Sequence, residues 1–206
     1  MVNVGNGTPA MPTTVAGAKA VAIAGEEIWK SYAPKVAKNA KVHGGALTLV
    51  DGMTEADIAE VAAAGVKVLA ECGKGPVKDV NKLAEYAKIA KKHGMVVTAH
   101  SGGACCDNCA NITADDLLKI NPDVICSLNG APTPMTEADI DKVLAGDFYY
   151  TLVPHGNLGE VLKIAEKAMK AGKLGKLLAG SNTPHDGYTV LGTWIIVAAL
   201  ADKFQD

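Results

Sequence analysis

Short apolar runs alternate with helix-like stretches along the whole chain, and this alternation limits the possible folds more than any other feature. The runs that read as strands are bounded by glycine, proline or polar residues, at 2–4, 41–50, 66–71, 95–100, 123–128, 148–153 and 174–181. The stretches between them carry helix start and stop signals, at 15–32, 55–64, 77–93, 113–120, 137–144, 158–171 and 189–203. About seven strand–helix units of roughly 30 residues each predict an α/β fold with a parallel sheet.

Several helix ends are marked by single residues. Thr13 or Thr14 can cap the first helix, and Pro34 is expected to stop it. Thr54 can cap the second helix. The sequence from Thr113 to Asp116 reads as a capping box with aspartate in the usual glutamate position, opening the helix that ends near residue 120.

Two architectures fit a run of parallel strand–helix units. An open doubly wound sheet tolerates seven strands, whereas a closed barrel needs eight, usually in about 250 residues. The segment 4–9 lacks the third glycine of a dinucleotide-binding loop and runs into proline, which disfavours the nucleotide-binding alternative. We therefore predict one domain over residues 1–206, an incomplete TIM-like (β/α) barrel of about seven units.

The two end helices, 15–32 and 189–203, are the most apolar in the chain, and a helix apolar on all sides is buried on all sides. In a barrel that lacks one unit these helices would flank the gap. We expect a homo- or hetero-oligomer in which another polypeptide covers them. The alternative is that both helices simply pack tightly on a small sheet.

Charge and composition exclude several classes of protein. A net charge of −2 does not favour nucleic-acid binding, and the longest apolar run, 194–201, is far short of the roughly 18 residues that span a bilayer. The first residues lack a basic region followed by an apolar one, so a secretory signal is not expected. Five cysteines in such a chain favour a reducing cytoplasm, with thiols that are free or bound to metal.

Polar residues gather where the expected strands end. Four histidines, His43, His100, His155 and His185, are assigned to strand carboxyl ends, the rim where an α/β barrel keeps its chemistry. Glu71 ends the third expected strand. A buried carboxylate needs a partner, so Glu71 and His100 could share one divalent cation, with His43 as a further candidate ligand. The alternative is a hydrogen bond between Glu71 and His100 in a polar rim.

A cluster of thiols follows His100 closely. Cys105, Cys106 and Cys109 have a spacing that can bind zinc or iron, but no second Cys-x-x-Cys pair exists to complete a four-thiolate site. They could equally be small residues of a folded loop. Other rim residues offer hydrogen bonds to a small-molecule substrate, and Lys74 could attract an anionic group or simply be solvated. The predicted substrate-binding residues are Lys74, Ser127, Asn129 and His185.

Several short segments, in the same order along nearly the whole chain, resemble the enamidase-like branch of the metal-dependent amidohydrolase superfamily. They are 41–45, 70–73, 99–103, 113–116, 121–124, 129–133 and 180–184. The resemblance implies a distorted (β/α)8 barrel with a one- or two-metal site that hydrolyses C–N bonds in cyclic amides and enamides. It also implies that this chain lacks the first barrel strand, with its His-x-His motif, and the flanking β-sandwich.

The resemblance assigns roles residue by residue. Glu71 matches the metal-bridging carboxylate of the fourth barrel strand, and His100 matches the histidine of the fifth. Ser127 stands where the family has a third metal-binding histidine, and Asn182 stands where it has the aspartate that binds metal and acts as general base. Two ligands are therefore lost, and His155 or His185 would have to act as the base.

Two functions stay open. The chain is either one part of a split amidohydrolase, with a partner chain supplying the first strand, or a non-catalytic scaffold that binds metal or a small ligand. In the first case we expect a divalent metal, zinc before iron, to activate water. The residues predicted to take part in catalysis are Glu71, His100, His155 and Asn182.

Overall fold

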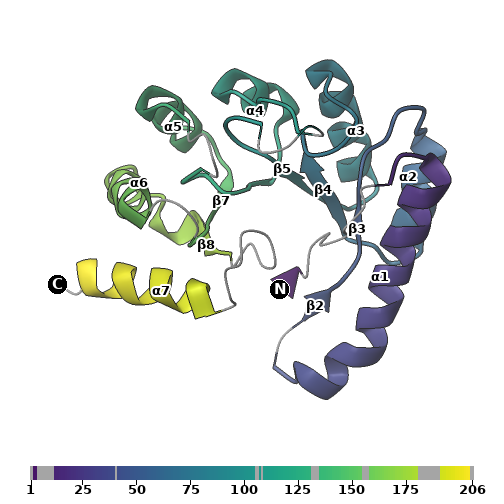
Figure 1. Ribbon diagram of the computed structural model, residues 1–206, viewed down its shortest axis with the longest axis horizontal. Coiled ribbons are helices and arrows are strands. Elements are labelled where there is room, and N and C mark those ends of the chain that lie inside the picture. The colour runs from purple at the N-terminus through teal and green to yellow at the C-terminus, as the bar shows by residue number, and fades with distance from the viewer. Residues whose placement is uncertain are drawn as a thin grey trace. The chain divides into compact units, whose positions relative to one another are not determined.

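The structure, a computed structural model, describes residues 2–3, 12–39, 41–104, 107, 109–130, 135–154, 158–180 and 191–204. The chain divides into two compact units, Met1–Ala99 and His100–Asp206 (Figure 1). Each unit repeats the predicted alternation of strand and helix, and each is described by itself.

The strands of the first unit are all parallel to their neighbours. They are β1 (Val2–Asn3), β2 (Val42–His43), β3 (Ala46–Leu47), β4 (Val68–Cys72) and β5 (Val96–Ala99). β1 pairs with β2, and separately β3, β4 and β5 lie side by side in chain order. Ala46 lies opposite Val68, and Cys72 lies opposite Ala99. This register fixes the position of each residue of β3, β4 and β5 along the strand direction.

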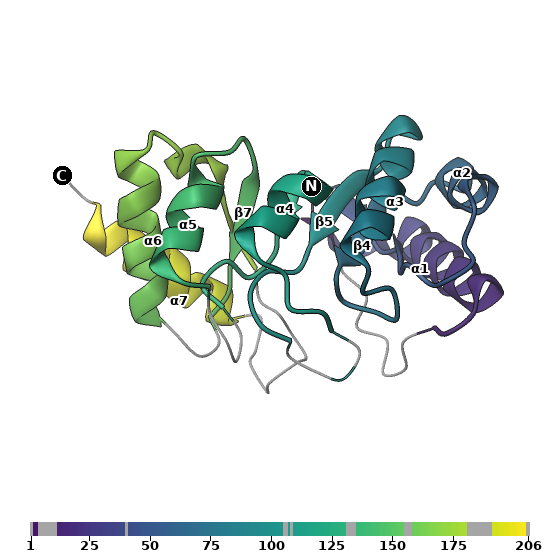
Figure 2. The ribbon, with the colours of Figure 1, turned by 90° about the horizontal axis from the view of Figure 1, so that it is seen from above.

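The helices of this unit connect its parallel strands, as a βαβ arrangement requires. They are α1 (Val15–Val36), α2 (Glu55–Ala63) and α3 (Val80–Lys92). α1 packs on β2 and β3, α3 packs on β4 and β5, and α2 contacts both of the other helices (Figures 1 and 2). The side chains of Leu47, Leu69 and Val97, one from each of the three paired strands, are fully buried.

Local start signals at α1 and α2 were predicted correctly, whereas α3 begins at Val80, capped by Asp79, three residues later than expected. Thr14 caps α1 by accepting a hydrogen bond from Gly17 N at 3.1 Å. Thr54 and Asp57 form a capping box at α2, in which each side chain accepts from the backbone N–H of the other residue. The expected end of α1 was wrong, because the helix continues through Pro34 to Val36. Proline removes only one hydrogen bond, and the bond from Ala37 N to Ala33 O still closes the last turn.

The strand expected at 41–50 is two short strands, β2 and β3, separated by Gly44 and Gly45. Both glycines donate their N–H groups to Glu26 Oε2, at 3.1 Å each, instead of to a neighbouring strand. α1 approaches closely enough that a Cβ at Gly44 would overlap Trp29, and one at Gly45 would lie 2.9 Å from Glu26 Cβ. The contact with α1 therefore interrupts the strand.

The second unit has three parallel strands in chain order and a row of helices. The strands are β6 (Val124–Ile125), β7 (Tyr149–Leu152) and β8 (Leu177–Ala179). The helices are α4 (Ala114–Ile120), α5 (Glu137–Leu144), α6 (Leu158–Lys170) and α7 (Leu191–Lys203), with a 3₁₀ turn, η1 (Leu174–Lys176), before β8. Each α-helix packs beside the next, and α7 also contacts β8 (Figure 2).

The core of the second unit is held by aliphatic side chains and by one tyrosine. Tyr150 on β7 is fully buried, and its hydroxyl donates to Val143 O of α5 at 2.9 Å. At the surface, Lys167 of α6 forms an ion pair with Asp141 of α5 at 2.7 Å. The predicted capping box of Thr113 with Asp116 is present at α4. Within the described residues, no helix combines the length and apolar character needed to cross a membrane.

Candidate functional site

His100 is a buried polar residue at the start of the second unit. Its side chain is 3% exposed, and its ring Nε2 lies 3.0 Å from Gly103 O. A carbonyl oxygen only accepts hydrogen bonds, so Nε2 carries the proton and Nδ1 is the nitrogen that could bind a metal or accept a proton. Metal-binding histidines usually donate their other N–H to a carbonyl or carboxylate in this way.

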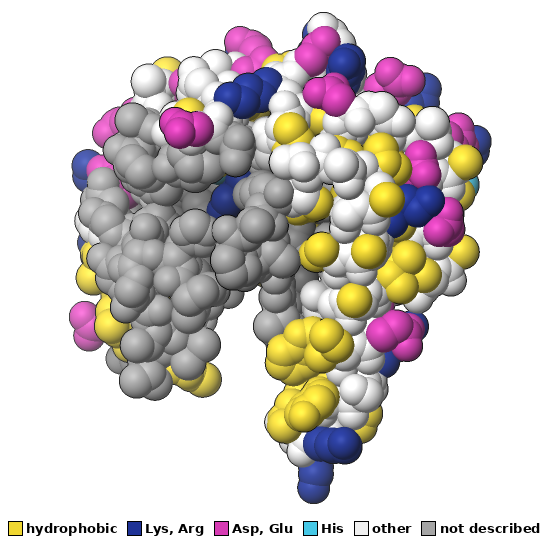
Figure 3. Space-filling view, turned by 45° about the vertical axis from the view of Figure 1, so that its right-hand side comes forward, with side chains coloured by type: hydrophobic (Ala, Val, Ile, Leu, Met, Phe, Trp, Pro, Cys, Tyr) yellow, Lys and Arg dark blue, Asp and Glu magenta, His cyan; other side chains and the backbone are white. Residues whose placement is uncertain are grey.

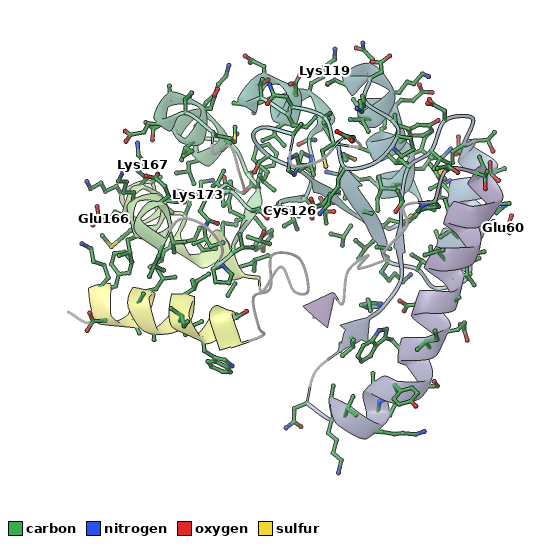
Figure 4. All side chains as sticks on the ribbon, in the orientation of Figure 1. Glu60, Lys119, Cys126, Glu166, Lys167 and Lys173 are labelled. Carbon is green, nitrogen blue, oxygen red and sulfur yellow. The ribbon has the colours of Figure 1, made fainter. Side chains whose placement is uncertain are left out.

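Ser101 ties the segment after His100 to the end of β6. Its hydroxyl is 2.7 Å from Cys126 O and 3.3 Å from Ser127 O, and its side chain is 2% exposed (Figure 4, Cys126). The hydroxyl has a single proton, so its main hydrogen bond is the shorter one, to Cys126 O. This bond connects the residue after His100 to the segment after β6.

Ser127 occupies a left-handed backbone conformation, with φ of 55°, which is uncommon for a residue other than glycine. Its N–H donates to Thr151 Oγ1 at 2.8 Å, and this bond to β7 holds the turn in place. Such backbone strain is often found at functional sites. Here it falls at the position where the family resemblance expects a metal-binding histidine.

Asn129 was predicted to bind substrate, but its amide is used within the fold. Nδ2 donates to Val153 O at 2.8 Å, and Oδ1 accepts from Val153 N at 2.9 Å. The side chain is 1% exposed. The two bonds imitate a strand-to-strand pairing beyond the ends of β6 and β7, so the structure assigns Asn129 to the framework of the site.

In the first unit, Glu71 lies near the carboxyl end of β4, as predicted, and is partly exposed. The next residue, Cys72, lies opposite Ala99, the last residue of β5. Cys72 is 1% exposed, and burial raises the pKa of its thiol to about 12. Lys74 N donates to Glu71 O at 2.9 Å in the turn that follows β4, so the predicted Lys74 also belongs to this end of the strand.

His43 is the last residue of β2, as predicted for a strand carboxyl end, but β2 pairs with β1 and not with the strands that carry Glu71. Gly44 and Gly45 separate β2 from β3, so the register of β3 with β4 does not extend to His43. Its Nδ1 is 3.1 Å from Glu26 Oε1. His43 is therefore part of the contact with α1.

Glu26 is the buried charged residue that the sequence interpretation missed. It is 3% exposed and accepts hydrogen bonds from the ring of His43 and from the N–H groups of Gly44 and Gly45. Its spacing in the sequence was the available signal. Glu26 follows the buried Ala22 by four residues and Ala18 by eight, so all three lie on the same face of α1. A carboxylate on the buried face of an apolar helix must have partners.

Cys109 differs from the expectation of a free or metal-bound thiol. Cys109 is disulfide-bonded and 3% exposed, whereas Cys72 and Cys126 carry thiols. The other two predicted ligands of this loop, Cys105 and Cys106, lie outside the described residues. A sulfur in a disulfide does not offer the thiolate that a metal prefers, so Cys109 is not a metal ligand in this structure.

The remaining predicted site residues, His155, Asn182 and His185, also lie outside the described part of the chain. Among the residues that are described, no group of three or more His, Cys, Asp or Glu side chains could hold a metal ion. Glu71 and His100 are thus the predicted ligands whose surroundings the structure defines.

Comparison with known proteins identifies the relationship, although no family model matches the chain. Over 177 residues the chain is 36% identical to an enamidase from Eubacterium barkeri, covering 85% of this chain and 45% of that protein. The crystal structure of enamidase, described as a new member of the amidohydrolase superfamily, matches 87% of this chain with a TM-score of 0.78 at 35% identity. This chain is an enamidase homologue.

The family resemblance and the predicted fold class, an incomplete TIM-like barrel, are both confirmed by this match. The enamidase homologue spans less than half the length of its relative, 45% of the sequence and 46% of the crystallised chain. A phospho-2-dehydro-3-deoxyheptonate aldolase from Thermotoga maritima shares 20% identity over 70% of this chain and 44% of its own, with a TM-score of 0.45.

Proposed function

We propose that the enamidase homologue takes part in hydrolysis of a C–N bond in a cyclic amide or enamide, with Glu71 and His100 as ligands of one divalent metal. The observation that carries the proposal is the 36% identity to an enamidase over most of this chain. The family resemblance implies metal ligands at both positions. The state of His100 agrees with that role, because it is buried and Nε2 donates to a backbone carbonyl.

The donor set fits part of a metal site. A carboxylate and an imidazole suit zinc, with iron as the second choice. Catalytic zinc sites use three protein ligands, so a further ligand must join Glu71 and His100. When bound, the metal would lower the pKa of a water molecule and polarise the amide carbonyl. The contribution of this chain is to hold His100 in one tautomer through Gly103 O.

We propose further that another polypeptide covers the outer faces of α1 and α7, in a homo- or hetero-oligomer. Ile28, Tyr32 and Val36 follow one another at intervals of four residues on α1 and are 58%, 57% and 66% exposed (Figure 3). On α7, Trp194 is 69% exposed and Ile195 is 56% exposed. Large apolar side chains exposed together are typical of protein interfaces. A partner could also supply the ligand that the metal needs.

The second candidate function is a non-catalytic subunit that binds metal or a small ligand. Ser127 favours it, because serine stands where the family has a histidine and the backbone there is held by Thr151. A serine hydroxyl is a poor substitute for imidazole as a zinc ligand.

The test is to measure bound zinc and iron in the purified chain after equilibration with each metal. We expect Glu71→Gln and His100→Gln to abolish stoichiometric binding. His93→Gln is the matched control. His93 caps the carboxyl end of α3, its ring Nε2 lies 3.2 Å from Glu55 Oε1, and it has no proposed role in metal binding. Binding that survives both site variants would contradict the metal site.

Activity distinguishes the two candidate functions. Cyclic amides are incubated with the metal-loaded chain, alone and with co-expressed candidate partners, and release of the ring-opened product is measured. Hydrolysis that requires Glu71 and His100 supports the hydrolase. Stoichiometric metal binding without hydrolysis in any combination supports the non-catalytic subunit.

A further inference from the structure

The second half of α1 has no buried residue. The residues that the helix buries all lie in its first half, and they are Ala18, Ala22 and Glu26. Beyond them, Ile28, Tyr32 and Val36 form one apolar stripe about 12 Å long, because eight residues of α-helix rise by that distance. We call these three residues the α1 ridge. Figure 3 shows apolar side chains along this end of the helix and lysines at its tip.

The helix that carries the ridge is fixed from its inner side. Trp29 packs on Gly44 so closely that a Cβ there would overlap its ring. One turn earlier, Glu26 accepts the N–H groups of Gly44 and Gly45, at 3.1 Å each. These contacts fix the rotation of α1 about its own axis, so the ridge stays exposed. A surface that is ordered in advance loses little conformational freedom on binding.

The same end of α1 carries positive charge that the described structure does not neutralise. Glu27 is the only carboxylate in residues 27–41, and it pairs with Lys30 at 2.6 Å. The exposed lysines here that form no ion pair with a described carboxylate are Lys35, Lys38 and Lys41. Lys35 Nζ lies 5.3 Å from the centre of the Tyr32 ring, so one of these charges lies on the ridge itself.

A second copy of this chain is poorly suited to supply the missing negative charge. In the described structure most carboxylates on helix surfaces already pair with lysines of the chain itself. On α5, for example, Asp141 pairs with Lys167 at 2.7 Å. Such carboxylates would have to leave their own lysines in order to reach those of α1. A different polypeptide with unpaired carboxylates meets them without this loss.

Building on the proposed oligomer, we propose that the α1 ridge binds an acidic amphipathic helix of a different polypeptide. Apolar residues repeated every four positions form a ridge that fits the groove of another helix. The apolar side of the partner helix covers Ile28, Tyr32 and Val36, and its carboxylates meet the three lysines. Charge pairs at the rim of an interface are screened by salt, so binding weakens as ionic strength rises.

The experiment selects binding peptides without assuming a partner. A phage-displayed library of random peptides of about 20 residues, long enough to form a helix, is panned on the full-length chain in the presence of chelator. We expect the selected peptides to share apolar residues at intervals of three or four and several Asp or Glu residues. Selected peptides without this acidic and apolar pattern would overturn the proposal, and so would a library that yields no binder.

Variants then test where the selected peptides bind, with fluorescence anisotropy as the measure of affinity. The triple variant Lys35→Glu, Lys38→Glu, Lys41→Glu should weaken binding by at least about ten-fold, and Tyr32→Ser by a similar factor. The matched control reverses three exposed lysines elsewhere that also lack an ion pair in the described structure, Lys88→Glu, Lys119→Glu and Lys170→Glu. It should change the affinity by less than about two-fold.

Circular dichroism verifies that each variant is folded. Equal affinities of the ridge variant and the control variant would overturn the proposal. Sedimentation of the chain with phosphatidylglycerol vesicles, lost in the ridge variant and without any selected acidic peptide, would assign the ridge to a membrane surface instead. A dimer in sedimentation velocity that Tyr32→Ser dissociates would assign it to a second copy. None of these measurements requires metal or hydrolysis, so they stand apart from the metal site of Glu71 and His100.

Discussion

Nδ1 of His43 lies 3.1 Å from Oε1 of Glu26, and both side chains are buried where α1 meets the interrupted strand. The second oxygen of Glu26 accepts the N–H groups of Gly44 and Gly45. One carboxylate thus replaces the backbone ladder at the break between β2 and β3. It also holds the long first helix on the sheet of the first unit.

The first prediction concerns this carboxylate. Glu26→Ala leaves an imidazole and two backbone N–H groups buried without their acceptor, so we expect the free energy of unfolding to fall by about 3 kcal/mol. Urea denaturation of the full chain measures it. The control is Glu27→Ala, whose side chain is 59% exposed and which should change stability by about 0.5 kcal/mol or less. Equal effects of the two substitutions would contradict this account of Glu26.

Asn129 should matter for stability rather than for ligand binding. Asn129→Leu removes the bonds to both Val153 N and Val153 O, and we expect a loss of about 2 kcal/mol in the free energy of unfolding. Asn129→Asp keeps the acceptor for Val153 N, loses the donor to Val153 O and adds a buried carboxyl group beside that carbonyl. The exposed Asn81→Asp in α3 is the matched control. If Asn129→Leu unfolds at the same urea concentration as the unmodified chain, the framework role is wrong.

The hydroxyl of Tyr150 should make the free energy of unfolding decrease at alkaline pH. Burial raises the pKa of its hydroxyl to about 12 from 10.0, so the folded protein keeps this proton after the unfolded chain has lost it. The stabilisation that arises from this difference in pKa is complete below pH 10 and is lost as pH rises towards 12. We expect this loss to approach about 2 kcal/mol.

The measurement compares urea denaturation between pH 8 and 11.5 for the unmodified chain and for Tyr150→Phe. The variant should be less stable at pH 8 by about 1 kcal/mol, because Val143 O loses its donor, and its stability should fall less steeply above pH 10. Parallel pH profiles would show that Tyr150 does not titrate as described.

The two thiols of the described structure should differ in reactivity. Cys72 is 1% exposed with a pKa raised to about 12, whereas Cys126 is partly exposed. Because the thiolate is the reactive form, iodoacetamide at pH 8 should label Cys126 at least about ten times faster. Peptide mass spectrometry of a time course measures both rates. In urea the difference should disappear, and a difference that persists there would have a local chemical cause rather than burial.

Much of the fold could be read from local signals. The capping residues Thr14, Thr54 and Thr113 start the predicted helices, and the bounds of α5 agree with the expected range. These signals act between residues three or four apart, so they need no tertiary contact. The family resemblance and the fold class are likewise carried by short motifs in the right order.

The candidate site was predicted only in part. Glu71, His100 and His43 were correctly placed near the ends of their strands, but the sequence did not show that His43 belongs to a separate strand pair, β1 with β2. The roles of Asn129 and Cys109 depend on which partner each one meets.

By itself, the sequence determined the order of strands and helices, the starts of most helices and the family of the chain. Only the tertiary structure decided that Glu26 contacts His43 and that Cys109 is disulfide-bonded. The physical reason is how far apart along the chain the interacting residues are. Caps and periodicity arise from neighbours along the chain, whereas a buried charge or a cross-link takes its partner from whatever the fold brings beside it.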